Sequence, residues 1–193
     1  TYASIKYDMD LSSSATGAGG MTLLSTQTAS SDSTITFASG IDSTYKEYIF
    51  KYYDIHPSAG VRLAVNFRDG STAYDATKTS TFFEAYQNEA GTSTSLAYVT
   101  DYDLAQSTAV QSIGYIGNEN DESCAGTLHL YDPSSTTFVK HYIATTPGYH
   151  GSNLALTSYV AGYCNVTAAI DGVQFSMTSG NIDSGTFKMY GVS

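Results

Sequence analysis

The stretch Val173-Gln-Phe-Ser-Met-Thr-Ser-Gly-Asn-Ile-Asp-Ser-Gly-Thr-Phe-Lys-Met-Tyr-Gly-Val192 decides the fold. In its first half, Val173, Phe175 and Met177 alternate with polar residues. Phe187 and Met189 do the same in its second half, after a Ser-Gly-Asn interruption. A period of two residues places one side of a strand on a core and the other toward solvent or a partner. The pattern predicts a closing hairpin of two strands, with the C-terminus built into a sheet.

Similar alternation recurs along the rest of the chain. We expect further strands at residues 21–28, 34–39, 45–55, 61–68, 81–87, 124–131, 136–144 and 154–164. Residues 88–110 show no clear period, and 103–110 are either one helical turn or an irregular crossover. Many short strands without alternating helices predict an all-β fold, a two-sheet antiparallel β-sandwich. We expect a jelly roll, with a lectin-like sandwich as the alternative.

The chain divides into an N-terminal arm, residues 1–20, and one sandwich domain, residues 21–193. Residues 11–20 are mostly Ser, Gly and Ala and lack the apolar groups needed to fold alone. We expect a flexible arm that attaches the protein to a larger structure. Residues 45–55 carry apolar side chains on both faces, which indicates a doubly covered strand or one face at an interface. The candidate attachment or interface residues are Tyr2, Ile5, Tyr7, Leu11, Tyr48 and Tyr52.

Composition narrows the classes of function. The chain contains 26 Ser and 25 Thr, and only 13% of its residues are charged, about half the usual share of ~25%. The net charge is −10, and the eight Lys and Arg residues form no patch. Nucleic-acid binding needs clustered cations, so it is not expected. The negative charge equally disfavours docking on an anionic membrane, and no apolar run approaches the ~18 residues of a membrane span, so we expect no membrane partner.

Motifs for catalysis and metal binding are sparse. The sequence has no nucleophile elbow, zinc-protease motif or phosphate-binding loop. The only Glu pair in a plausible position is Glu84 and Glu89, and we expect no enzyme activity. His129 and His141 fall on neighbouring predicted strands, where they could face each other and begin a metal site. The alternative to a metal site there is a pair of ordinary surface positions.

The acidic loop at residues 117–123 is the richest in oxygen ligands. Carboxylates and amides at close spacing suit a hard cation such as calcium, although the spacing matches no EF-hand. The candidate calcium ligands are Asn118, Asn120, Asp121 and Glu122. The alternative is a solvated loop, and no other cofactor is indicated. Cys124 and Cys164 fall in predicted strands, which favours two reduced thiols over a disulfide.

Several segments resemble a family of virion structural proteins of marine tailed bacteriophages. They include Met21-Thr-Leu-Leu-Ser-Thr-Gln-Thr, Ile116-Gly-Asn-Glu-Asn-Asp-Glu-Ser, and Gly126-Thr-Leu-His-Leu-Tyr-Asp-Pro-Ser-Ser, besides the C-terminal stretch. The likeness covers nearly the whole chain. Its motifs belong to strands and turns, so the resemblance implies a virion component and no active site.

The resemblance implies a capsid decoration (cement) protein or a surface fibre or spike module, located in the virion. The alternative is a tail domain that binds a host receptor or surface glycan. The implied partners are other copies of the chain, in a homotrimer, and the major capsid or tail proteins. A homotrimer would cover the apolar outer faces of the sheets.

Overall fold

The structure, a computed structural model, describes residues 20–193. All but the last residue of the predicted arm lies outside this range, as do the candidate attachment residues Tyr2, Ile5, Tyr7 and Leu11. Within 20–193 the chain has no helix, and therefore no helix that could cross a membrane. Its strands are β1 (Met21–Asp32), β2 (Thr34–Phe37), β3 (Glu47–Pro57), β4 (Val61–Arg68), β5 (Lys78–Asn88), β6 (Thr94–Tyr98), β7 (Gln111–Ile116), β8 (Cys124–Tyr131), β9 (Lys140–His150), β10 (Leu154–Cys164), β11 (Gly172–Met177) and β12 (Ile182–Val192).

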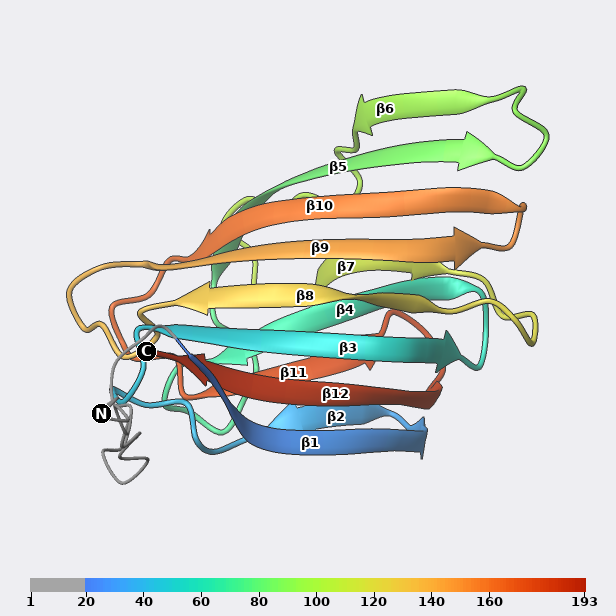
Figure 1. Ribbon diagram of the computed structural model, residues 1–193. Coiled ribbons are helices and arrows are strands. Elements are labelled where there is room, and N and C mark those ends of the chain that lie inside the picture. Colours follow the sequence, from blue (N-terminus) through green and yellow to red (C-terminus); the bar gives the residue numbers. More distant parts are fainter. Residues whose placement is uncertain (1–19) are drawn as a thin grey trace, which may run out of the picture.

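The strands form two antiparallel sheets packed face to face (Figure 1). The larger sheet has the order β1-β12-β3-β8-β9-β10-β5-β6, and the smaller has the order β2-β11-β4-β7. The predicted all-β, two-sheet sandwich is therefore confirmed, and the arrangement is compatible with a jelly roll. In Figure 1 the larger sheet extends past the smaller one on the side of β5 and β6.

The two C-terminal strands do not form the predicted hairpin. β11 lies in the smaller sheet between β2 and β4, whereas β12 lies in the larger sheet between β1 and β3. Their apolar rows therefore meet across the core, where the rings of Phe175 and Phe187 lie 5.0 Å apart. Alternation defines which side of each strand is buried, but it does not define the neighbouring strand. The prediction that the C-terminus is built into a sheet is confirmed.

β3 lies between β12 and β8, and its inward side carries Tyr48, Phe50 and Tyr52. None of these three side chains has exposed surface. The hydroxyl of Tyr48 bonds to Asp42, and that of Tyr52 lies 2.5 Å from Oγ1 of Thr146. The prediction of Tyr48 and Tyr52 as interface residues is wrong, because the residues of the opposite parity face outward. These three aromatic rings belong to the core, whereas Tyr53 of the same strand is exposed.

The segment without a clear period, residues 88–110, contains β6 and an irregular crossover that leads to β7. β6 pairs with β5 from Phe83 opposite Tyr98 to Gln87 opposite Thr94. Sequence alternation misses β6 because almost all of it is exposed, so neither side needs an apolar row. The crossover then returns under the overhanging part of the larger sheet, where Tyr102 packs on Phe82 with ring centroids 5.4 Å apart.

Candidate functional site

The outer side of β9, β10, β5 and β6 is the candidate site, and we call it the uncharged face. The strand registers place Tyr159 beside both Thr145 and Phe83, and Phe83 beside Tyr98. Counting in twos from these pairs gives the outward side chains. They are Thr79, Thr81, Phe83, Ala85, Gln87, Thr94, Leu96, Tyr98, His141, Ile143, Thr145, Pro147, Tyr149, Ala155, Thr157, Tyr159, Ala161 and Tyr163. None of them is Asp, Glu, Lys or Arg, although the chain has a net charge of −10.

Apolar and aromatic groups stand exposed on the uncharged face. Phe83 and Tyr159 stack in parallel, with centroids 4.9 Å apart and an interplanar angle of 12°. Ile143, Leu96 and Tyr98 are exposed on the same side. A monomer seldom displays so many large apolar groups together unless the surface contacts something.

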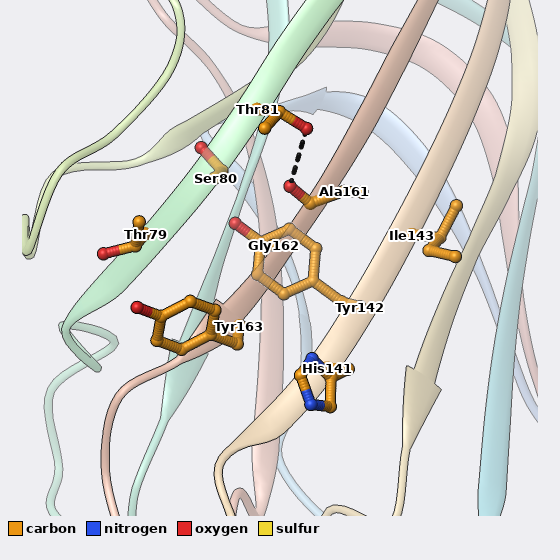
Figure 2. Close-up of a pocket in the computed structure, with 9 residues that line it drawn as sticks. All are labelled: Thr79, Ser80, Thr81, His141, Tyr142, Ile143, Ala161, Gly162 and Tyr163. Carbon is orange, nitrogen blue, oxygen red and sulfur yellow. Dashed lines mark hydrogen bonds between the residues drawn. The ribbon is translucent and has the colours of Figure 1, made fainter.

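A groove of about 440 Å³ lies in this face, over the C-terminal end of β10 (Figure 2). Ala161 and Gly162 line it together with the side chains of Thr79, Thr81, His141, Ile143 and Tyr163. The small residues at the centre keep it open, and Oγ1 of Thr81 donates to the carbonyl of Ala161 at 3.3 Å. Gly162 is required for another reason, since a Cβ there would lie 2.6 Å from the hydroxyl oxygen of Tyr142.

A second hollow, of about 680 Å³, lies at the other end of the same strands. Gln87, Tyr149 and Ala155 line it, but so do the acidic residues Asp54 and Glu89. The hydroxyl of Tyr149 donates to Oε1 of Glu89 at 3.1 Å. This hollow is therefore acidic at its rim, and the groove over β10 is the better candidate for an uncharged ligand or partner.

A buried ion pair connects the two sheets below the uncharged face. Arg62 of β4 donates to both carboxylate oxygens of Glu84 on β5, at 2.6 and 3.2 Å, and each side chain is only 12% exposed. Ser158 donates to the same carboxylate at 2.8 Å. The guanidinium also stacks on the ring of Tyr102, 3.6 Å from its centroid. Glu84 is thus occupied by a structural contact, and Glu89 accepts a hydrogen bond from Tyr149, so the two carboxylates have different partners.

Two lysines lie buried beside Cys164, and neither has a carboxylate partner among residues 20–193. The register places Lys78 and Lys140 on either side of Cys164, and none of the three has exposed surface. Nζ of Lys78 donates to Oδ1 of Asn66 at 2.5 Å and to the carbonyl of Ala76 at 2.8 Å. Burial lowers the pKa of Lys78 to about 8 and raises the pKa of the Cys164 thiol to about 12. Burial disfavours the charged form of both groups.

Cys124 and Cys164 are both free and buried. Cys124 lies opposite Gly148 and Cys164 opposite Lys140, eight positions apart along β9. That separation is far beyond the reach of a disulfide. Burial also raises the pKa of the Cys124 thiol well above its usual range, so neither sulfur is a ready nucleophile.

Of the four predicted calcium ligands, Asn120, Asp121 and Glu122 line one hollow of about 330 Å³, whereas Asn118 does not. Asn118, Asn120 and Asp121 are exposed, whereas Glu122 is buried. Oε2 of Glu122 accepts the backbone N–H of Glu119 at 2.7 Å, so it closes the loop on itself. Among residues 20–193, no three His, Cys, Asp or Glu side chains gather in an arrangement that could hold a metal ion.

His129 and His141 do not face each other. His129 lies opposite Ile143 and pairs with Glu47, whose Oε1 is 2.6 Å from its Nδ1. His141 lies opposite Tyr163 and lines the groove. The two histidines do not pair, because the register of β8 on β9 places His141 two residues away from the position opposite His129. This register cannot be determined from the predicted limits of the strands alone.

Comparison of the chain with protein-family models and with curated proteins found no match. Sequence reasoning also missed the uncharged face. Its only signal was the absence of charged residues from alternate positions of 79–87 and 155–163. That absence acquires meaning only when the register brings the strands together.

Proposed function

We propose that the chain is a non-enzymatic structural module of a bacteriophage virion. It decorates the capsid or forms part of a surface fibre or spike, in contact with other copies of itself and with the major capsid or tail proteins. The observation that carries the proposal is the uncharged face. A protein of net charge −10 assembles with least repulsion through a surface without carboxylates, and this surface also offers apolar area to bury. The resemblance to marine-phage virion proteins supports the same role.

The test is to locate the chain on purified particles with an antibody raised against the recombinant protein. Labelling of the head or the tail by immuno-electron microscopy is the expected result, and particles without label would contradict the proposal. A second measurement links the role to the face. Ile143→Lys is expected to reduce incorporation into particles, whereas Ser43→Lys, an equal charge change at an exposed position away from the face, should leave it unchanged.

The groove over β10 favours a second candidate, a module that binds a neutral host-surface glycan. Its volume falls within the ~300–1,000 Å³ typical of ligand pockets. Tyr163 supplies a hydroxyl that both donates and accepts hydrogen bonds, as sugar hydroxyls do. Oγ1 of Thr81 donates to the carbonyl of Ala161 and can still accept, whereas Oγ1 of Thr79 accepts two bonds from Gln106 and can still donate. Binding of neutral oligosaccharides on a glycan array, lost in Tyr163→Ala and kept in Phe138→Ala, is the expected result for this role. An array without binding would leave the assembly role alone.

A further inference from the structure

β6 is an unprotected edge strand. Within residues 20–193 it pairs only with β5, and its outer edge meets no other strand. Its sequence, Thr94-Ser-Leu-Ala-Tyr98, contains no charge, no Pro and no Gly, and Leu96 is 74% exposed. Natural sheets protect their edges with lysine, proline, bulges or a covering segment. The opposite edge of the same sheet, β1, carries an irregularity between Leu23 and Ser25, whereas β6 keeps a regular register.

The hydrogen bonds on either side of β6 show which of its backbone groups are free. Asn88 N–H donates to the carbonyl of Ser93, and Val99 N–H donates to the carbonyl of Phe82, each at 3.0 Å. In an antiparallel pair, alternate residues bond to the neighbour. The odd-numbered residues of β6 therefore bond to β5. Thr94, Leu96 and Tyr98 direct their N–H and C=O groups to the open edge.

We propose that β6 pairs antiparallel with β6 of a second copy of this chain, around a twofold axis at Leu96. In this register Leu96 faces Leu96 of the second copy, and Thr94 faces Tyr98. Every free N–H and C=O on the two edges then finds a partner. The eight-stranded sheets of the two copies become one continuous sheet, as in strand addition to an open edge.

The acidic residues that follow β6 favour antiparallel over parallel pairing of two copies. Asp101 and Asp103 follow β6 at its C-terminal end, and Tyr98 donates its hydroxyl to Oδ2 of Asp103 at 2.6 Å. Antiparallel pairing holds the acidic ends of the two strands roughly 14 Å apart, whereas parallel pairing would place them side by side. The side chains of Thr94, Leu96 and Tyr98 lie on the uncharged face, so the pair also joins two such faces without burying a carboxylate.

This pairing is independent of the virion role. A twofold contact yields dimers and even-numbered assemblies, so the homotrimer expected from the sequence would need a contact elsewhere. The contact is small and is expected to be weak and dependent on concentration.

The first test is the oligomeric state of the purified chain by sedimentation velocity over a wide concentration range. We expect a monomer–dimer equilibrium in the wild type and a monomer for Leu96→Lys, which places two lysines face to face. Leu96→Pro removes only an outward N–H, so it should also give a monomer with β5 pairing intact. Phe138→Lys is the matched control, because Phe138 is 70% exposed and lies on another part of the surface; it should dimerise like the wild type. A wild type that stays monomeric at every concentration would overturn the proposal, as would a Leu96→Lys variant that dimerises normally.

The second test fixes the register. Residue 96 faces itself across the twofold axis, where the Cα–Cα distance of a hydrogen-bonded pair, about 5.5 Å, suits a disulfide. Leu96→Cys is expected to form a covalent dimer under mild oxidation, since the native cysteines are buried. Thr94→Cys should not cross-link alone, but should do so together with Tyr98→Cys. Cross-linking of Thr94→Cys as readily as Leu96→Cys would show that the register is different.

Discussion

Removing one partner of the buried Arg62–Glu84 pair should destabilise the sandwich far more than removing both. Each side chain is 12% exposed, and the pair makes two hydrogen bonds. Glu84→Met leaves the guanidinium buried without its carboxylate, which typically costs about 3–5 kcal/mol. It also takes the acceptor from Ser158, for about 1 kcal/mol more. In a chain of 193 residues this corresponds to a melting temperature lower by roughly 10–20 °C.

The assay is a double-mutant cycle by urea denaturation. Arg62→Met and Glu84→Met are measured alone and together, and the double variant should recover most of the loss, because two apolar side chains need no desolvated charge. Lys46–Asp132 is the control pair, with side chains 79% and 43% exposed, and Lys46→Met should cost less than about 1 kcal/mol. A connecting role of the pair is refuted if the losses in unfolding free energy of Arg62→Met and Glu84→Met simply add in the double variant. It is also refuted if each single variant loses no more than Lys46→Met.

Three further predictions concern the interior. Lys78 has a pKa near 8 when folded, against about 10.5 when unfolded, so the unfolded chain binds more protons between these values. The measurement is the difference between the urea midpoints of the wild type and Lys78→Met. This difference should stay constant below pH 7 and shift in favour of the wild type from pH 8 to pH 10. A difference that stays constant over the whole range would contradict the burial of the ammonium group. Gly162→Ala brings a methyl group against the Tyr142 hydroxyl and should cost about 1–3 kcal/mol in the same assay, whereas an unchanged midpoint would show that the strand can shift. Cys124 and Cys164 should resist iodoacetamide in the native state and react fully in urea, and rapid labelling of the native protein would show that the thiols are accessible.

The strands with an apolar row on one side could be predicted from the sequence. β4, β8, β10 and β11 lie within a residue or two of the expected limits, because an apolar row at every second position is the direct result of packing one face on a core. β6 and β7 were not predicted. β6 is exposed on both sides, and β7 follows a crossover without any period, so neither leaves an alternating pattern to read.

The candidate site could not be predicted residue by residue. Thr81, Ile143 and Ala161 are unremarkable in the sequence, and they share a groove only because the registers of β5, β9 and β10 bring them together. The acidic loop, by contrast, looked like a ligand set in the sequence. The structure turns Glu122 inward, where it accepts a backbone N–H.

The sequence by itself determined that this protein is an antiparallel β-sandwich, rich in hydroxyl residues and low in charged ones, with a C-terminus within a sheet. These properties follow from alternation and composition, which are local. Only the tertiary structure decided that the last two strands belong to opposite sheets, that Tyr48 and Tyr52 are core residues, and that β6 leaves an open edge. The physical reason is that strand alternation records which side is buried, while pairing and register depend on contacts between residues far apart in the chain.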